Sequence, residues 1–351
     1  MHYVGLDVHA KRSSLCILNG DGKVVKREMV HGPWPAAVER LREVGASAGG
    51  PLSVCYEAGC GYGPLHDALS PLAAHVAVAH PGALRLIFKA KKKHDRVDSD
   101  KLATLLYLGQ VPAVHVPSAD VRQWRKLIEL RQSLLAGRVR EKNRVRAVLR
   151  NHAVAVPKRP GLWTKKGAAW LASVRLPQGE RLAVDLASEA IASANARLAR
   201  VEAELAKYAA AHPGVALLMT IPGVGVRTAE AFVAYVDDPS RFARVRQVGS
   251  YFGLVPTLDS SAGRDRRGHI TREGPGTVRK LLTEAAWQSV WRDPASRALF
   301  ERVTRGKADR RKIAAVAVAH RLCRVMAAML RTGEAYRAAR ASEGPRGPVS
   351  E

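Results

Sequence analysis

Four acidic side chains within the first hundred residues have types and spacings that suit metal-dependent chemistry on phosphates. Asp7 interrupts one apolar segment, Glu57 ends another, and Asp95 and Asp98 lie three residues apart where a helix is predicted to begin. An acid within an apolar strand is costly unless something compensates it, and a divalent cation is the usual compensation. We therefore expect Asp7, Glu57, Asp95 and Asp98 to bind two Mg²⁺ or Mn²⁺ ions, an arrangement that cuts and joins phosphodiester bonds.

Each acid taken alone also has a simpler interpretation. Asp7 could cap a turn, Glu57 could be a solvated acid at a strand exit, and the acids at 95 and 98 could favour a helix N-terminus through the macrodipole. Their combination favours the metal site. Three lysines that precede the last two acids also favour it, because they would contact the phosphates that the metal ions bind. These lysines are Lys91, Lys92 and Lys93.

A small α/β domain would carry these acids. Apolar segments at 3–9, 13–18 and 23–25 predict a meander of strands, with Asp21-Gly22 as a turn. Strands are also predicted at 51–59 and 74–79, and helices at 36–44, 63–70 and 81–88. The same meander opens the ribonuclease-H-like nucleases and the actin-like ATPases. The sequence lacks convincing copies of the second Asp-x-Gly loop and the Gly-Gly adenosine loop of the ATPases, so we expect an RNase-H-like (RuvC-like) fold over residues 1–115.

The charge of the chain indicates a polyanionic partner. Its 351 residues contain 57 Lys and Arg against 31 Asp and Glu, a formal net charge of +26, and 47% of the residues are hydrophobic. This excess is far beyond what solubility requires and favours nucleic acid, in a globular protein of two or three domains. We expect a cytoplasmic, nucleoid-associated protein, because the start lacks a signal-like segment and no apolar run approaches the length of a spanning helix. Four cysteines without zinc-ligand spacing are expected to be reduced thiols.

The middle of the chain predicts a basic, helical connector over residues 116–210. Residues 121–152 form a long helical pattern with an apolar stripe that includes Trp124, Ile128 and Val139. The other face is mostly basic, which favours contact with a phosphate backbone over an ordinary solvated face of mixed charge. Its candidate nucleic-acid contacts are Arg138, Arg140, Lys142, Arg144 and Arg146.

A seven-residue repeat follows in the connector. Ile191, Leu198 and Leu205 are spaced by one heptad each within residues 184–210. This spacing predicts a coiled-coil seam about three heptads long. An amphipathic helix packed on its own domain explains the same pattern, and so short a repeat does not separate the two.

The C-terminal domain, expected over residues 211–332, has two further motifs. Residues 217–230 resemble a helix-hairpin-helix, in which Gly223 and Gly225 would expose backbone N–H groups to a phosphate; a structural helical hairpin is the alternative. Further along, Ser260 and Ser261 lie in a loop of small residues among arginines. A serine there could serve turn chemistry, or it could be a nucleophile beside phosphate-binding groups. The candidate phosphate contacts are Arg264, Arg266, Arg267 and Arg272.

In combination and in order, these motifs resemble one family across residues 3 to 330. It comprises insertion-sequence transposases with an N-terminal DEDD domain similar to the RuvC resolvase and a C-terminal serine domain, called the IS one-ten family, and this chain looks closest to its eleven-eleven branch. The motifs are Gly5-Leu6-Asp7-Val8-His9, Tyr56-Glu57-Ala58-Gly59, Lys93-His94-Asp95-Arg96-Val97-Asp98, Ile221-Pro222-Gly223-Val224-Gly225, Gly253-Leu254-Val255-Pro256, Ser260-Ser261-Ala262-Gly263 and Gly268-His269-Ile270-Thr271-Arg272-Glu273-Gly274.

The resemblance implies more than the residues do. It implies that the four acids are the metal-binding set, and that Ser261, or Ser260 in the alternative register, forms a covalent phosphoserine with DNA. It implies donor and target DNA, a structured guide (bridge) RNA and a homo-oligomer, dimer or tetramer, as partners. Two departures stand out: Ala262 occupies an expected glycine position and Pro275-Gly276 replaces an expected asparagine.

Two other functions remain open. A RuvC-like, metal-dependent, junction-resolving nuclease would use the four acids alone and leave hydrolysed ends. A basic DNA-binding protein without enzymatic activity would bind DNA independently of metal, although the intact set of acids argues against it. Residues 333–351 are expected to form a polar, disordered tail.

Overall fold

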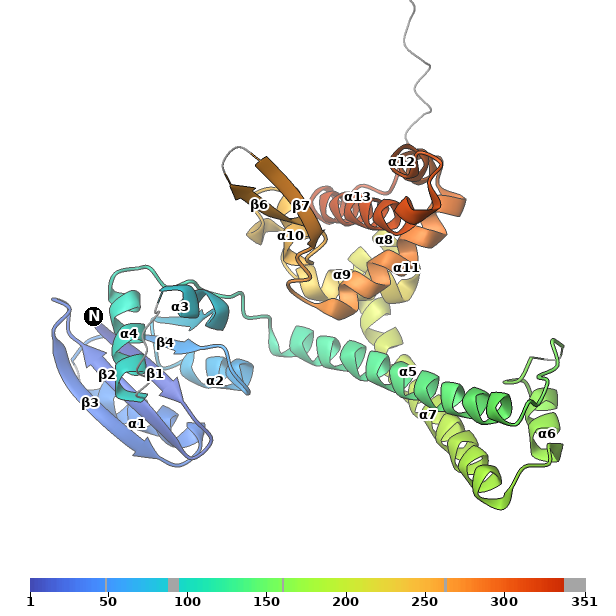
Figure 1. Cartoon of the computed structure of the whole chain (residues 1–351). Helices are drawn as coiled ribbons and strands as arrows, with labels where there is room; N and C mark the ends of the chain where they lie inside the picture. The colour runs from blue at the N-terminus through green and yellow to red at the C-terminus, as the bar shows by residue number, and fades with distance from the viewer. Residues whose placement is uncertain (48, 88–94, 160, 262–263, 338–351) are drawn as a thin grey trace, which may run out of the picture. The chain divides into compact units, whose positions relative to one another are not determined.

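The computed structural model describes residues 1–47, 49–87, 95–159, 161–261 and 264–337, without the side chains of 95–97, 258–261 and 264–267. The chain forms two compact units, residues 1–122 and residues 123–351. Figure 1 labels the helices and strands of both units. The expected Lys91, Lys92 and Lys93 contacts lie outside the described residues.

The first unit is built on a mixed sheet of the order β3-β2-β1-β4-β5. Strands β1 (His2–Val8), β2 (Arg12–Leu18) and β3 (Val24–His31) are antiparallel, which confirms the predicted meander. Strands β4 (Leu52–Glu57) and β5 (His75–Ala79) continue the sheet in parallel with β1. Parallel neighbours need crossover connections, and the predicted helices between them supply these.

Helices cover both faces of this sheet. Helices α1 (Trp34–Ser47) and α2 (Tyr62–Leu69) pack on the face that includes Leu6 and Tyr56. Helix α4 (Asp95–Tyr107) packs on the opposite face, where Cys16 and Cys55 are buried; the short helix α3 (Pro81–Ile87) precedes it. The mixed sheet with a helical C-terminal region is the architecture expected at the coarse level, and the strands fall where the apolar segments predict them.

Two long helices of the second unit pair antiparallel. Helix α5 (Ala119–Asn151) begins just before the unit boundary, and α7 (Gln178–Ala211) returns along it, with α6 (Lys165–Ser173) between them (Figure 1). Trp124 stacks on Tyr208 with ring centroids 5.6 Å apart, whereas Val148 and Val184 share a cluster at the other end. Ile191, Leu198 and Leu205 are all buried, as the heptad spacing predicts. Leu205 shares a core cluster with Leu218 and Phe232, so burial alone does not distinguish a coiled coil from an amphipathic helix packed on its own domain. The predicted stripe on α5 is wrong at Val139, which is 50% exposed.

The rest of the second unit is a mainly helical body. Its core is formed by α9 (Val226–Val236), α11 (Gly276–Arg292) and α13 (Arg311–Thr332), with Phe232, Leu282 and Leu322 fully buried. Around them lie α8 (Pro213–Leu218), the 3-10 turn η1 (Pro239–Arg241), α10 (Arg246–Tyr251), α12 (Pro294–Thr304) and the 3-10 turn η2 (Ala308–Arg310). One hairpin, β6 (Pro256–Ser261) and β7 (Arg264–Ile270), projects from this body.

Two expectations about the C-terminal part need correction. The stretch 308–332 is long and apolar enough to span a membrane by length and composition, although no such run was expected, and half of it is buried as α13 of the core. The disordered tail does not begin at residue 333, because the backbone N–H of Tyr336 donates to Thr220 Oγ1 at 3.1 Å and its hydroxyl donates to Asp293 Oδ1 at 3.0 Å. Residues 338–351 lie outside the described part.

Candidate active site

The first pair of predicted acids lies at the ends of neighbouring parallel strands. Leu6 of β1 and Tyr56 of β4 are register partners, and Asp7 and Glu57 directly follow them. Because side chains alternate along a strand, both acids belong to the face opposite the buried Leu6 and Tyr56, which is the α4 face. The carboxyl ends of parallel strands are where ligands collect in α/β sheets. This register brings two of the predicted metal ligands to one edge of the sheet, and their binding of a metal stays a prediction.

Helix α4 brings the second pair of acids to the same edge. Its last residue, Tyr107, packs edge-on against Tyr3 at the start of β1, with centroids 5.4 Å apart. Its Ser99 Oγ lies 3.1 Å from Ser14 Oγ, and Ser14 is the register partner of Asp7. The helix therefore runs opposite to β1, and its first turn, which begins at residue 95, lies near the end of β1. The helix N-terminus also places a partial positive charge there, which favours carboxylates.

Gly5 allows this close packing of α4 on the sheet. A Cβ atom at Gly5 would stand 2.0 Å from the carbonyl oxygen of Ser99 and 2.4 Å from the backbone nitrogen of Ala103. No side chain fits between the strand and the helix at this point. Gly5 is thus a structural requirement for the position of the first turn of α4.

The described acids are held by basic neighbours. Asp7 Oδ2 lies 3.1 Å from His9 Nε2, and its side chain is 17% exposed. Asp98 Oδ1 accepts a hydrogen bond from Lys101 Nζ at 2.9 Å, and Glu57 is exposed. Within the described residues no three His, Cys, Asp or Glu side chains are grouped closely enough to hold one ion, and the side chain of Asp95 is not among them. The backbone thus brings the acids toward one edge of the sheet, but the described side chains do not form a complete metal site.

Asp100 on α4 has a different role from the four predicted metal ligands. Both of its carboxylate oxygens accept from Arg27 Nε, at 3.0 and 3.1 Å. Burial opposes its ionisation, but hydrogen bonds from Arg27 and Cys16 hold the pKa of Asp100 below its ordinary value. Burial, together with Asp100, raises the pKa of the Cys16 thiol to about 12, so this cysteine is a neutral core residue.

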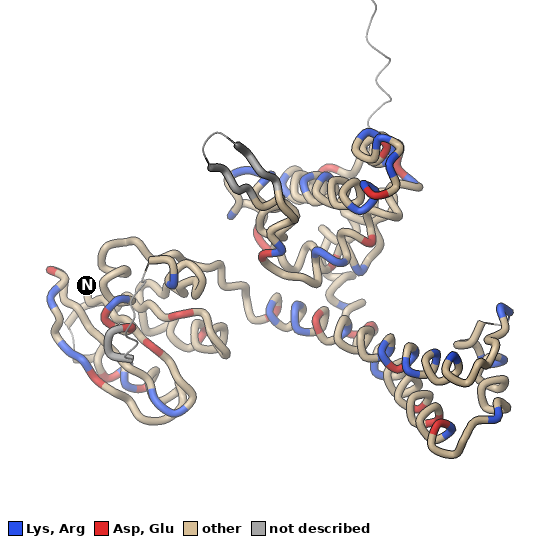
Figure 2. Tube along the Cα trace, viewed as in Figure 1, with Lys and Arg blue, Asp and Glu red and all other residues tan. Residues whose placement is uncertain are grey.

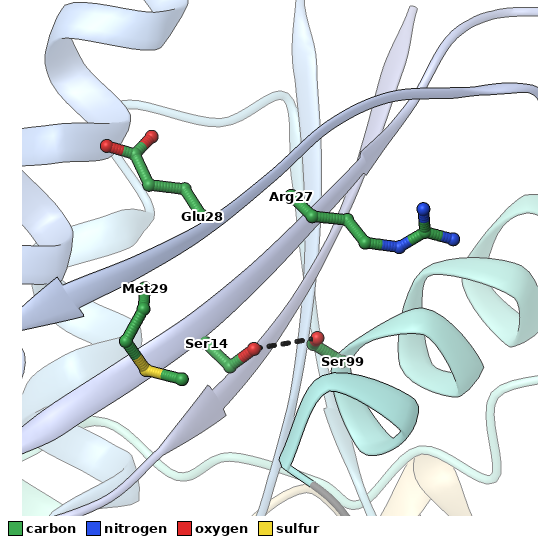
Figure 3. A pocket seen from close by; sticks show the side chains of 5 residues that line it. All are labelled: Ser14, Arg27, Glu28, Met29 and Ser99. Carbon is green, nitrogen blue, oxygen red and sulfur yellow. Dashed lines mark hydrogen bonds between the residues drawn. The ribbon is translucent and has the colours of Figure 1, made fainter.

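A cavity of about 200 Å³ adjoins the acidic edge. Figure 3 shows Ser14 and Ser99 pointing toward each other across it, with Arg27 and Met29 from β3 beside them. Sequence reasoning missed these two serines. Their only signal was position, since Ser14 interrupts an apolar strand opposite Asp7, and Ser99 immediately follows Asp98.

The two candidate nucleophiles lie in a hairpin rather than in a free loop. Ser260 and Ser261 are the last residues of β6, and their register partners on β7 are Asp265 and Arg264. The expected loop is thus shorter than predicted, because the arginine-rich segment after it pairs back as a strand. Arg266 and Arg267 also lie on β7, and none of these side chains is among the described ones.

Gly223 and Gly225 differ in what surrounds them. Gly223 has a φ of +94°, and a Cβ there would stand 2.5 Å from the backbone nitrogen of Ser289 on α11. Gly225 is the N-cap residue of α9 and is exposed. Nothing lies within 4 Å of a Cβ atom added to Gly225. Gly223 is therefore explained by internal packing, whereas Gly225 borders an accessible helix N-terminus.

Comparison with known proteins gives both units a family. Residues 215–301 match the family described as "Transposase IS116/IS110/IS902 family", and residues 4–153 match the DEDD-type transposase family of IS110 elements. The chain belongs to the IS110 family of transposases. This confirms the IS110 family named from the sequence, whereas the eleven-eleven branch and the serine chemistry stay predictions.

Individual relatives extend this finding along the IS110-family chain. The transposase of insertion element IS1111A from Coxiella burnetii is 25% identical over 95% of this chain and 91% of its own length. A Sinorhizobium fredii relative is 30% identical over 66% of this chain, which spans 57% of that relative. A 43.6 kDa protein of insertion element IS110 from Streptomyces coelicolor is 34% identical over 39% of this chain and 33% of its own length.

The basic face of α5 in this IS110-family chain is partly engaged in its own fold. Arg138 donates to Asn195 Oδ1 on α7 at 2.9 Å, and Arg144 donates to Glu141 at 2.9 Å. Lys142 Nζ and the Arg146 guanidinium lie 5.0 and 5.5 Å from the centre of the Trp163 ring. These residues thus have contacts within the fold, and their contact with nucleic acid stays a prediction.

Mutual repulsion nevertheless persists along α5. Burial, followed by the charges of Arg138 and Arg146, lowers the pKa of Lys142 from its ordinary value. Arg140 is exposed and carries no ion pair within the described part of the chain. A polyanion laid along this helix would relieve the repulsion.

Arg272 lies where the hairpin rejoins the helical body. It is exposed, with φ +57°, a conformation that costs a residue other than glycine about 1–2 kcal/mol. Burial, followed by the charge of Arg272, lowers the pKa of Arg279, so the two guanidinium groups lie near each other. Arg279 is anchored by the carbonyl oxygens of Phe252 and Glu273, at 3.0 and 2.8 Å, which leaves Arg272 as the accessible cation of the pair.

Proposed function

We propose that this chain is the DNA transposase of an insertion sequence and that the acidic edge of its first unit is one half of the catalytic machinery. The observation that carries the proposal is the register of β1 and β4, which sets Asp7 and Glu57 side by side at adjacent strand ends with the first turn of α4 nearby. Membership of a transposase family supplies the class of reaction.

The acidic edge fits a divalent cation by the chemistry of its donors. Mg²⁺ and Mn²⁺ prefer carboxylate oxygens, and Asp7, Glu57, Asp95 and Asp98 would hold the ions. The bound ions would lower the energy of the charged oxygens that develop during phosphoryl transfer. His9 positions Asp7 through the 3.1 Å contact, and Lys101 positions Asp98 by donating to its Oδ1.

The serine hairpin would supply the other half of the machinery. Ser261, with Ser260 as the alternative register, attacks the phosphorus of a DNA phosphodiester through its Oγ. A phosphoserine bond forms, the bond to the DNA leaving oxygen breaks, and that oxygen takes a proton to become a free DNA hydroxyl. A hydroxyl of another DNA strand then attacks the phosphoserine, which joins the strands and restores the serine hydroxyl. Arg264, Arg266, Arg267 and Arg272 would offset the phosphate charge.

Further features of the proposal rest on the family resemblance and on charge. A net charge of +26 can hold more than one polyanion, so we include donor DNA, target DNA and a structured guide RNA as partners. We also propose a homo-oligomer in which the acidic edge of one copy serves the hairpin of another. The proposed domain bounds are 1–115, 116–210 and 211–332.

The proposal is tested by trapping the covalent intermediate. The full chain, copurified with any bound nucleic acid, is incubated with Mg²⁺ and labelled DNA that spans an element junction, and covalent adducts are separated under denaturing conditions. We expect adducts with the unaltered chain, none with Ser261→Ala, and strongly reduced amounts with Asp7→Asn. Asp100→Asn is the matched acidic control, because Asp100 binds Arg27 and should leave adduct formation intact.

A second candidate function is a metal-dependent, junction-resolving nuclease. It is favoured by the fact that the acidic edge is formed entirely by residues 1–122, without the hairpin. Hydrolysed DNA ends without any covalent adduct would support this nuclease and contradict the serine mechanism. If neither cutting nor adducts are found and Asp7→Asn binds DNA as tightly as the unaltered chain, the chain is a DNA-binding protein without enzymatic activity.

A further inference from the structure

An exposed tryptophan stands near the end of α11, away from the hairpin and the acidic edge in sequence. Trp291 is 71% exposed, the largest exposure among the large apolar side chains of the described residues except Leu86. Trp287 precedes it by one helical turn and packs edge-on against Phe300 of α12, with centroids 5.5 Å apart. Residues four apart share a face of a helix, so the two indoles form one aromatic strip on α11. Contiguous exposed apolar surface rimmed by polar residues is typical of binding sites.

Basic side chains accompany this strip. The Arg311 guanidinium lies 5.9 Å from the centre of the Trp287 ring, which joins the start of α13 to the strip. Arg292 follows Trp291 directly, and Arg305 and Lys307 lie in the connection from α12 to α13. All four basic residues are exposed, and none has an ion pair within the described part of the chain. We call Trp287, Trp291, Arg292, Arg305, Lys307 and Arg311 the aromatic-basic patch.

The backbone around the patch is fixed in place. Arg297 donates to the carbonyl oxygens of Val290 and Trp291, at 3.2 and 2.8 Å, which closes the end of α11. The buried Asp293 accepts from the Ser296 backbone nitrogen at 2.9 Å and from Arg321 at 3.2 Å, which locks the start of α12 against α13. A surface held in this way loses little conformational entropy when it binds a ligand.

Two features of the patch are unfavourable for the isolated protein. Arg305 adopts a φ of +50°, a strained conformation for an arginine, and the following Gly306 also has a positive φ of +72°. Arg311 and Lys312 begin α13, where the helix dipole favours acids rather than bases. A negatively charged ligand bound beside Arg311 and Lys312 would offset the cost of placing these two cations at a helix N-terminus.

The chemistry of the patch selects one kind of ligand. An apolar protein partner would bury four cations without counter-ions, which is costly, whereas a nucleic acid supplies phosphates to them. A duplex buries its base faces in the stack, so only an unpaired base can stack on Trp291. We propose that the aromatic-basic patch binds single-stranded DNA, with Trp291 stacked on a base and Arg292, Arg305, Lys307 and Arg311 on neighbouring phosphates. The residues of this site differ from those of the proposed serine and metal chemistry.

The binding test uses the full chain without divalent metal, so it does not depend on catalysis. Fluorescence anisotropy gives the Kd for a labelled oligo(dT) strand of about 16 nucleotides and for a duplex of the same length. We expect Trp291→Ala to weaken binding to the single strand by about fivefold or more, with a much smaller change for the duplex. Trp291→Phe should restore most of the affinity, because phenylalanine keeps a stacking face.

A matched control lies on the neighbouring helix. Ile313 is 59% exposed but has no π face, so Ile313→Ala should leave the Kd for the single strand unchanged. Unchanged binding in Trp291→Ala, or an equal loss for single strand and duplex, would overturn the proposal. A Trp291-dependent preference for an RNA strand of the same sequence over DNA would overturn the assignment to DNA. Failure of the adduct experiment would leave this measurement unaffected, so the two proposals can fail separately.

Discussion

At the scale of single residues, substitutions of two glycines in one turn are expected to have different effects on stability. Gly223 has a positive φ and no room for a Cβ against Ser289, so Gly223→Ala should lower the free energy of unfolding by about 1–3 kcal/mol. Gly225→Ala adds a methyl group in open space and should leave stability within about 0.5 kcal/mol. Urea denaturation of both variants measures the difference.

DNA binding by the same two variants tests the helix-hairpin-helix proposal. If the N-terminus of α9 contacts phosphate, Gly225→Ala should weaken DNA binding although the fold is intact, because the methyl group stands where the backbone is approached. Unchanged binding in Gly225→Ala would mean that this turn is a structural helical hairpin.

A third glycine tests the acidic edge itself. Gly5→Ala would place a methyl group 2.0 Å from the Ser99 carbonyl oxygen, so α4 must shift away from the sheet. We expect a loss of stability in the first unit and weaker Mn²⁺ binding, measured by calorimetry. Gly20→Ala is the control in the same unit, because nothing lies within 4 Å of its added methyl group. Normal metal binding in Gly5→Ala would contradict the assignment of the first turn of α4 to the metal site.

The sequence was informative about the acids because strand ends are visible in it. An apolar run interrupted by Asp7 and another that ends at Glu57 predict two strands, and α/β topology collects ligands at strand ends. The contact of Asp98 with Lys101 is an i,i+3 pair, which helical spacing allows. The approach of Ser99 to Ser14 does not follow from spacing, because it depends on how α4 packs on the sheet.

At the scale of elements, the heptad positions of α7 predicted burial but not the partner. The partner is α5, as the contacts from Trp124 to Tyr208 and from Arg131 to Glu202 show. We expect Leu198→Ala, at a 4% exposed seam position, to cost about 2–5 kcal/mol of unfolding free energy. Leu182→Ala on the same helix removes the same atoms from a 59% exposed side chain and should cost little. Equal effects would contradict the paired seam.

A buried network joins α11, α12, α13 and the segment after α13, and it predicts a pH dependence. Burial opposes the ionisation of Asp293, but hydrogen bonds from Ser296 and Tyr336 and the charge of Arg321 outweigh it and hold the pKa of this carboxyl below its ordinary value. A lowered pKa in the folded state stabilises the protein above the unfolded pKa of about 4, and this stability is lost as the pH falls through the folded value.

The free energy of unfolding should therefore decline from about pH 5 downward. In Asp293→Asn this decline should be shallower, because the titrating carboxyl is gone, and the variant should already be less stable at neutral pH. Asp309→Asn, at an exposed acid of the neighbouring 3-10 turn, serves as the control and should keep the full decline. An Asp293→Asn profile parallel to that of the unaltered chain would rule out this origin of acid sensitivity.

At the scale of the whole molecule, charge is the dominant feature. Figure 2 shows Lys and Arg along α5 and around α12 and α13, in regions with fewer acids. A net charge of +26 predicts that DNA binding falls steeply with salt, because each phosphate contact releases a counter-ion. If 6–10 phosphates are contacted, affinity should drop roughly 10³- to 10⁵-fold between about 50 and 200 mM salt.

Substitutions on the basic face of α5 test whether this helix contributes to the salt dependence of DNA binding. Arg140→Gln removes an exposed cation and should reduce the slope of log affinity against log salt by about one. Arg138 is bonded to Asn195, so Arg138→Gln should change the slope less and stability more. Identical slopes for the unaltered chain and Arg140→Gln would remove α5 from the DNA-binding surface.

The account as a whole depends on a covalent step shared between a serine and the acidic edge. The most direct measurement is mass spectrometry of peptides from the chain after reaction with element-junction DNA and Mg²⁺. The account predicts a nucleotide linked to the peptide that contains Ser261, absent without metal and absent in Asp7→Asn. DNA ends cut in a metal-dependent way, with no nucleotide on any serine, would contradict it.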